Sequence, residues 1–217
     1  MYIKDVKTIK QAIRELEKSM EIQEGFFYNL LRSDSDWSFI IKLHTFLEVI
    51  CTVLIIKELG REELTDVISR LEMSENIYGK TVFISKLSLL NKGAISYIRK
   101  ISEIRNFYVH NVKNISLTLK NYLKKLDKNQ IKSFVNSIGY DTYDEIKIEK
   151  VTITKKDFIL RNPRLAIHMA AFSVLAETIP QIRHEKLKFK EIRFKKKAAE
   201  FLLSLLEKKE KTEIRQL

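Results

Sequence analysis

The sequence contains few residues that interrupt or constrain a helical backbone. Its 217 residues include two prolines, five glycines and one cysteine. Proline and glycine are the residues least compatible with a helix interior, so their scarcity predicts a mostly α-helical protein. The single cysteine, Cys51, excludes a disulfide within this chain and any zinc site built from paired cysteines. It lies in the apolar run 49–53, so we expect a core residue rather than a nucleophile.

Other absences bear on location and chemistry. The first thirty residues alternate charged and apolar groups, unlike a signal peptide. The most apolar stretch, residues 46–56, is too short to span a bilayer and contains Glu48. We therefore expect a soluble, cytoplasmic protein with no membrane partner. The sequence has no H-E-x-x-H, no G-x-G-x-x-G, no complete P-loop and no G-x-S-x-G, which argues against nucleotide-driven and serine-hydrolase chemistry.

The spacing of apolar residues predicts an all-α protein with three parts. Residues 1–32 form a leading helix that packs on a bundle, residues 33–140 form the helical core, and residues 141–217 form a linker and basic C-terminal helices. The alternation in residues 147–154 predicts a short strand or an extended linker. The expected helices span residues 4–31, 37–59, 61–71, 82–90, 94–111, 117–126, 128–138 and 162–176, with a last basic helix from residue 186.

Positive charge is in excess. The formal net charge of +12 predicts a polyanionic partner, with nucleic acid first and an anionic membrane surface second. A lysine-rich composition that reflects genome bias is the alternative. Residues 186–197 interleave cations with Phe189 and Phe194, a pattern that suits RNA binding but equally suits a solvated amphipathic helix or a dimer helix. The basic residues of this stretch are Lys186, Lys188, Lys190, Arg193, Lys195, Lys196 and Lys197.

The most informative segment is Arg105-Asn106-Phe107-Tyr108-Val109-His110. A histidine takes and gives protons near neutral pH, and an arginine supplies a permanent forked charge for a phosphate. On an ideal helix Arg105 and His110 lie about 140° apart, whereas Asn106 and His110 share a face. For Arg105 and His110 to meet one phosphate, the helix must end or bend near Asn111, or a second chain must complete the site.

Residues 86–93 and 104–110 together resemble the HEPN superfamily, whose signature is an arginine and a histidine separated by four to six residues, with a polar residue after the arginine. Within it, the arrangement is similar to the mannitol-repressor-like branch, and the resemblance covers roughly residues 33–125. It implies a HEPN-like helical bundle that forms a homodimer. In that branch an upstream helix carries acidic residues on an inward face, a part that Asp36, His44 and Glu48 would take here.

The resemblance also implies a function. Many HEPN proteins are endoribonucleases that need neither a metal nor another cofactor, and they act in toxin–antitoxin or phage-defence systems beside an antitoxin or effector protein. By resemblance, Arg105 and His110 are the catalytic residues and Asn106 assists them in cleaving RNA through its 2′-hydroxyl. The alternative is a regulatory module of mannitol-repressor type without catalysis, or a protein that only binds nucleic acid.

Structural roles for the same residues remain open. Arg105 would then pair with Glu103, Glu145 or another acidic group and hold helices together, and His110 would cap the helix, where the dipole favours a cation. His44 and Glu48, four positions apart, either support the motif or form a partly buried hydrogen bond. The isolated His168 and His184 fit ordinary structural or surface positions.

Overall fold

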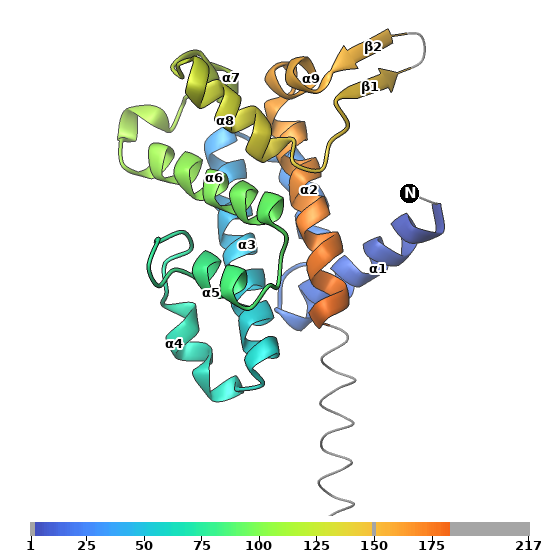
Figure 1. Ribbon diagram of the computed structural model, residues 1–217, viewed down its shortest axis with the longest axis vertical. Helices are drawn as coiled ribbons and strands as arrows, with labels where there is room; N and C mark the ends of the chain where they lie inside the picture. Colours follow the sequence, from blue (N-terminus) through green and yellow to red (C-terminus); the bar gives the residue numbers. More distant parts are fainter. Residues whose placement is uncertain (1–2, 149–150, 183–217) are drawn as a thin grey trace, which may run out of the picture.

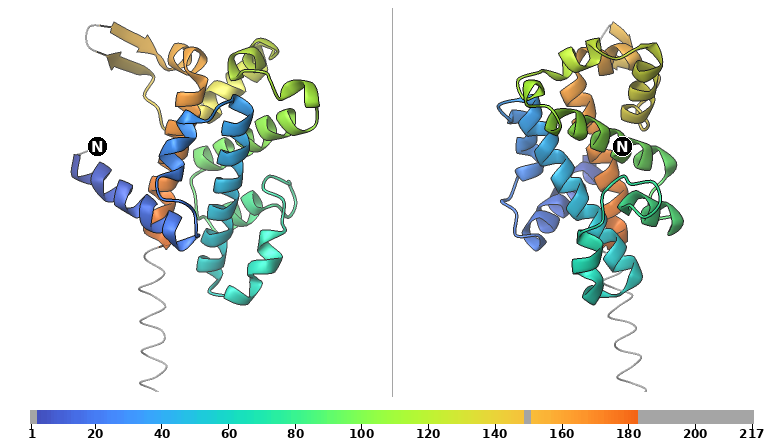
Figure 2. Two further views of the ribbon diagram at one scale, coloured as in Figure 1. Left: turned by 180° about the vertical axis from the view of Figure 1, so that it is seen from behind. Right: turned by 90° about the vertical axis from the view of Figure 1, so that its left-hand side faces the viewer.

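The computed structural model describes residues 3–148 and 151–182. It is an all-α bundle with one small β-hairpin, as the composition predicts (Figure 1). The long helix α3 (Asp36–Leu59) lies at the centre, with α6 (Lys92–Val109) packed against it. The last described helix, Pro163–Ile182, runs beside these two in the views of Figures 1 and 2.

The other elements surround this centre. The N-terminal part contains α1 (Ile3–Ser19), α2 (Phe26–Asn29), α4 (Thr65–Ser69) and α5 (Lys80–Lys86). Beyond α6 follow α7 (Leu119–Lys124), α8 (Lys128–Ile138), β1 (Glu145–Ile148), β2 (Val151–Thr154) and α9 (Lys155–Arg161). Short 3-10 turns occupy Leu30–Arg32, Glu62–Leu64 and Val112–Asn114.

Helix α3 confirms the boundaries expected from its flanking residues. The Ser35 side chain accepts a hydrogen bond from the Ser38 amide at 3.1 Å and so caps the start. At the other end Gly60 adopts φ 66°, the left-handed conformation that ends helices and that glycine tolerates best. Half of the helix's 24 residues are buried, including Phe39, Leu43 and Leu47.

The expectation of one helix over residues 4–31 is wrong. Helix α1 ends at Ser19, and the chain turns through Glu21 (φ 56°) and Gly25 (φ 83°) before α2. The fully buried Glu17 carboxylate accepts hydrogen bonds from the amides of Gly25 (2.7 Å) and Phe27 (2.9 Å). A buried charge needs such partners, so Glu17 holds the turn that the apolar stripe alone did not reveal.

Two other expected helix limits are also corrected. Residues 91–93 do not break a helix but start one, because the Asn91 side chain caps α6 by accepting from the Ala94 amide at 2.8 Å. Gly93 is needed there for space, since a Cβ atom would come within 2.6 Å of the Tyr140 ring. The helix expected over residues 162–176 is longer, because it continues through Pro180 to Ile182, the last described residue.

The extended segment expected at residues 147–154 is the hairpin of β1 and β2. The two strands pair antiparallel, with Glu145 opposite Thr154 and Ile148 opposite Val151. The hairpin projects from the bundle next to α9 (Figure 1).

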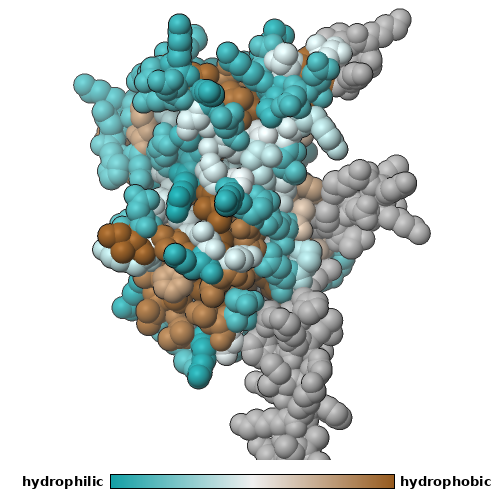
Figure 3. Space-filling view, in the orientation of Figure 1, coloured by the Kyte–Doolittle hydropathy of each residue, from teal (hydrophilic) through white to brown (hydrophobic). Residues whose placement is uncertain are grey.

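By length and composition alone, α3 and the helix Pro163–Ile182 would suffice to cross a membrane. However, 67% and 56% of their apolar windows are buried inside the bundle, as is usual for core helices, so this is weak evidence for a membrane span. In Figure 3 hydrophobic side chains gather on the surface over α4 and α5, where Val67, Ile77 and Tyr78 are exposed.

Candidate functional site

Helix α6 carries the whole motif. It ends at Val109, and His110 is its C-cap, with its amide donating to the Asn106 carbonyl at 3.1 Å. The helix therefore ends close to the expected position, directly before the histidine. The next turn is tied back to α6, because the Asn114 side chain donates to the Phe107 carbonyl at 2.8 Å.

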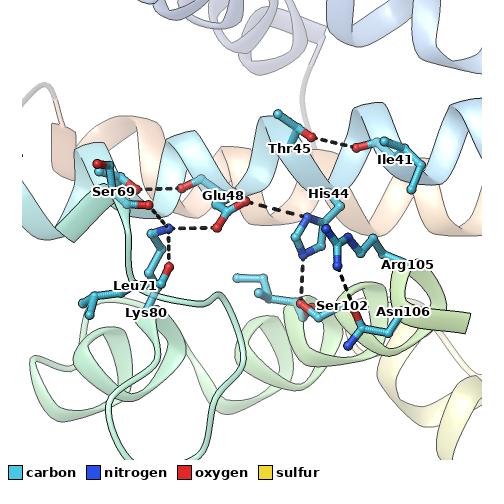
Figure 4. A network of polar contacts seen from close by, with 12 residues as sticks. Ile41, His44, Thr45, Glu48, Ser69, Leu71, Lys80, Ser102, Arg105 and Asn106 are labelled. Atoms are coloured by element: carbon cyan, nitrogen blue, oxygen red, sulfur yellow. Dashed lines mark hydrogen bonds and ion pairs between the residues drawn. The ribbon is translucent and has the colours of Figure 1, made fainter. Parts of the chain in front are cut away.

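Arg105 has no carboxylate partner within residues 3–148 and 151–182. Its Nη1 donates to the neighbouring Asn106 Oδ1 at 3.0 Å. Glu103 instead pairs with Lys100, and no ion pair with Glu145 forms. The half-buried Arg105 side chain extends toward α3 and lies beside the His44 ring (Figure 4). The described contacts therefore do not include the structural ion pairs proposed for this arginine.

His110 lies apart from Arg105. It is exposed, and its ring has no hydrogen bond or ion pair with any residue in the described part of the chain. Positions 105 and 110 of α6 point about 140° apart, as expected for a helix that remains regular through Val109. The structure brings Arg105 and Asn106 into contact, but it does not bring Arg105 and His110 together within one chain.

His44 connects the motif helix with α3. Its Nε2 lies 3.2 Å from Ser102 Oγ, and its Nδ1 lies 3.9 Å from Glu48 Oε2 (Figure 4). Burial lowers the pKa of His44 below 6.5; Glu48 opposes this, and the charges of Arg105 and Lys80 add to it. The neutral imidazole is thus favoured beside the Arg105 cation.

The sequence of contacts Ser102–His44–Glu48 has the order of a hydrolase triad, but its position does not suit catalysis. Ser102 is 3% exposed in the middle of α6, and its hydroxyl donates to the Ile98 carbonyl at 3.3 Å. Amides inside a helix are already bonded, so none is free to form an oxyanion hole there. We interpret these contacts as a structural tie between α3 and α6.

Glu48 makes its strongest contact with Lys80, a residue that the sequence motifs did not single out. Lys80 is fully buried, and its Nζ lies 2.9 Å from Glu48 Oε1, 2.9 Å from the Ser69 carbonyl and 2.7 Å from the Leu71 carbonyl. All three of its donors are satisfied. Lys80 therefore fixes the segment between α4 and α5 against α3 (Figure 4).

The sequence Gly79-Lys80-Thr81 matches the last three positions of a P-loop motif, but Ser74 occupies the position of the first glycine of that motif. The Glu75 carboxylate accepts hydrogen bonds from the amides of Ile77 (2.7 Å) and Tyr78 (2.6 Å). These bonds lower the pKa of Glu75. Because these amides and Lys80 already have partners, the loop does not form a phosphate cradle.

Asp36 lies away from this network. Its carboxylate accepts from the Leu119 amide at 2.7 Å and from Arg164 Nε at 2.6 Å. Arg164 also donates to the Ser33 carbonyl at 2.8 Å. Asp36 therefore joins the start of α3 to α7 and to the last described helix, near Tyr108 of the motif segment, whereas His44 is the member of the expected supporting set that lies beside Arg105.

The RNA-binding residues expected at 186–197 lie outside the described residues, as does His184. His168 is buried, stacks on Phe27 and contacts the Phe27 carbonyl at 2.9 Å, so it has the structural role expected of it. Cys51 is a buried core residue, as expected, and burial raises the pKa of its thiol to about 12. Within the described residues no group of three or more metal-ligating side chains is present.

Comparison with protein-family models, with curated proteins and with solved structures finds no match for this chain.

Proposed function

We propose that the protein is a cytoplasmic, metal-independent endoribonuclease of HEPN type that works as a homodimer. The observation that carries this proposal is the guanidinium of Arg105, which is oriented by Asn106 and has no carboxylate partner in the described part of the chain. Structural arginines at helix contacts are usually paired, as Arg164 is with Asp36. An unpaired arginine at the edge of the bundle is available to an anionic ligand.

RNA fits this arrangement because it carries its own nucleophile. In the proposed reaction His110 accepts the proton of a ribose 2′-hydroxyl, and the 2′-oxygen attacks the adjacent phosphorus. The bond to the 5′-oxygen breaks, that oxygen takes up a proton, and a 2′,3′-cyclic phosphate remains. Arg105 stabilises the charge on the pentacovalent phosphate, and Asn106 keeps the guanidinium in place. DNA has no 2′-hydroxyl and would not be cut.

A second copy is part of the proposal because Arg105 and His110 diverge within one chain. A two-fold arrangement of two α6 helices would set the arginine of one copy near the histidine of the other. The exposed side chains of Val109, Val112 and Ile115 flank His110 and offer apolar surface for such a contact. In a toxin–antitoxin or phage-defence role, an antitoxin or effector protein would be a further partner.

The alternative is a regulatory module of mannitol-repressor type without catalysis. The observation that favours it is the exposed ring of His110, which no described residue orients. A catalytic histidine usually has a second group that sets its tautomer. In this alternative, partner binding would be unaffected by His110→Ala.

The test is cleavage of total RNA and of transfer RNA in EDTA by the wild type, Arg105→Ala, Asn106→Ala and His110→Ala. We expect cleavage by the wild type with 2′,3′-cyclic phosphate ends. The Arg105 and His110 variants should lose at least about a hundredfold in rate, since general acid–base and charge-stabilising groups each contribute about that much or more. No cleavage, or equal cleavage by all four proteins, would reject catalysis for the free protein and favour the regulatory module.

A further inference from the structure

A groove of about 470 Å³ lies along residues 92–103 of α6, the part of the helix that precedes the motif. Helix α6 forms its floor, α5 contributes Ser85, and α8 contributes Ser133 and Ser137. The α5 and α6 helices lie toward the reader in Figure 1. The residues of α6 that line the groove are Lys92, Ile95, Ser96, Arg99, Lys100 and Glu103.

The groove has two positive charges in excess. Lys92 and Arg99 are exposed and have no carboxylate partner in the part of the chain that the structure describes, whereas Lys100 pairs with Glu103. Thr81 Oγ1 lies 3.3 Å from Arg99 Nε and holds this side chain, leaving its terminal nitrogens available. Three cations against one carboxylate make this a site for an anion.

Hydroxyl groups complete the set of donors. Ser96 and Ser137 join α6 to α8 through a 2.8 Å hydrogen bond, and Ser85 and Ser133 are exposed at the rim. Arginine, lysine and serine are among the side chains that contact nucleic-acid phosphates. None of the described residues that line the groove is aromatic, so the binding proposed for them does not include base stacking.

The start of α6 is not itself the anion site. The Glu177 carboxylate already accepts from the Asn91 amide at 2.7 Å and from the Asn91 side-chain amide at 2.8 Å. The binding groups of the groove are therefore side chains, and the helix N-terminus carries no part of the argument.

The groove is aligned with the motif along α6. At 100° per residue, the groove residues Lys92, Ser96, Arg99 and Glu103 and the motif residues Asn106 and His110 all fall within about 40° of one line along the helix. The carboxylate of Glu103 on this line is paired with Lys100. Arg99 precedes His110 by a rise of about 16 Å, and Lys92 precedes it by about 27 Å. This separation corresponds to a few nucleotides of one strand.

We propose that this groove binds the phosphate backbone of the RNA strand that reaches the motif, independently of its sequence. The inference rests on the proposed function for the identity of the polyanion. An acidic peptide is the other polyanion of this charge. RNA fits better because the guanidinium of Arg99 and the serine hydroxyls match phosphate oxygens, and because Lys92 and Arg99 lie on the same face of α6 as Asn106 and His110.

The experiment measures binding of a 2′-O-methylated RNA of mixed sequence in EDTA by fluorescence anisotropy over a range of salt. This probe has no free 2′-hydroxyl, so binding does not depend on cleavage. Lys92→Glu/Arg99→Glu is expected to weaken binding at least about tenfold, equally for different sequences. The slope of log K against log salt should fall by about 1.4, which is ~0.7 for each cation removed from a single-strand complex.

The matched control is Lys42→Glu/Arg70→Glu, which reverses two exposed cations of α3 and the end of α4 outside the groove. The control changes the net charge by the same amount as the groove variant. Its affinity for the methylated RNA should stay close to that of the wild type, apart from the small loss that the change in net charge causes. Arg99→Gln provides a milder variant if the double reversal impairs folding. Equal losses in both double variants, wild-type binding by the groove variants, or binding of poly-glutamate in preference to RNA would overturn the proposal.

Failure of the proposed function is distinguishable from failure of the groove. If natural RNA is not cleaved but the groove variants alone lose affinity for the methylated probe, RNA binding by the groove is supported and the proposed nuclease activity is rejected. If the wild type cleaves RNA and Lys92→Glu/Arg99→Glu cleaves and binds equally well, the nuclease stands and the groove is rejected.

Discussion

The ammonium of Lys80, which has no solvent exposure, lies 2.9 Å from a carboxylate oxygen of Glu48. The two residues are 32 positions apart and join the start of α5 to the middle of α3. Glu48 also lies beside His44, which contacts the motif helix through Ser102. One network therefore connects the segment between α4 and α5 with the helix that carries Arg105.

This pair predicts a large and asymmetric effect on stability. Glu48→Gln leaves the Lys80 charge buried with only carbonyl partners, and it should lower the free energy of unfolding by about 2–4 kcal/mol. Lys80→Met removes the charge that requires a partner, so it should lower the free energy of unfolding by less than Glu48→Gln does. Urea denaturation of both variants checks the order. An equal cost would contradict the view that the unpaired buried charge is the main penalty.

Two buried histidines predict loss of stability toward acid. Burial lowers the pKa of His44 and of His168 below the ordinary 6.5, so near that pH the unfolded chain binds more protons than the folded one. Their contribution is fully present above about pH 6.5 and declines as the pH falls toward the folded pKa values. The slope is at most ~1.4 kcal/mol per pH unit for each histidine.

Denaturation at pH 7.5, 6.5 and 5.5 measures this dependence. His168→Gln removes one titrating ring while retaining a donor for the Phe27 carbonyl, so its stability should fall less steeply with acid than that of the wild type. A pH dependence identical to the wild type would show that the pKa of His168 is the same in the folded and unfolded states, against this expectation.

Arg105 and Arg164 provide a matched pair of arginine variants. Arg164 binds Asp36 at 2.6 Å and the Ser33 carbonyl at 2.8 Å, so Arg164→Gln should cost roughly 1–3 kcal/mol. Arg105→Gln removes no ion pair and should change stability by less than ~0.5 kcal/mol. Thermal and urea unfolding compare the two. A large loss of stability in Arg105→Gln would assign Arg105 a structural role after all.

Substitution of Asp36 should lower the free energy of unfolding more than is usual for a residue near the surface. Its carboxylate receives the Leu119 amide and Arg164, which come from segments 83 and 128 residues away in the chain. Asp36→Asn keeps the shape but loses the charge, and we expect a loss of about 1–3 kcal/mol. Asp34→Asn, an exposed neighbour outside this clamp, is the control and should be close to neutral.

The local pattern of the sequence was sufficient for much of the secondary structure. The bounds of α3 and α8 follow from apolar spacing and from Gly60 and Gly139 after the last turns, with Ser35 as the expected cap of α3. The structure adds Asp127 as the cap of α8. These are interactions among neighbours in the chain. The error at residues 4–31 arose where a distant contact decides the conformation, because Glu17 binds amides eight and ten residues ahead.

The sequence by itself determined the helical character, the cap and the end of α3, the positive charge and the roughly 140° between Arg105 and His110, since each depends on composition, on neighbours in the chain or on helical geometry. Only the tertiary structure decided which charges are paired. Pairing depends on side chains brought together from far apart, as with Lys80 and Glu48 or Arg164 and Asp36. Those contacts leave Arg105 without a carboxylate within the described residues, and the packing of the helices brings Ser85 of α5 and Ser133 of α8 beside Lys92 and Arg99 of α6.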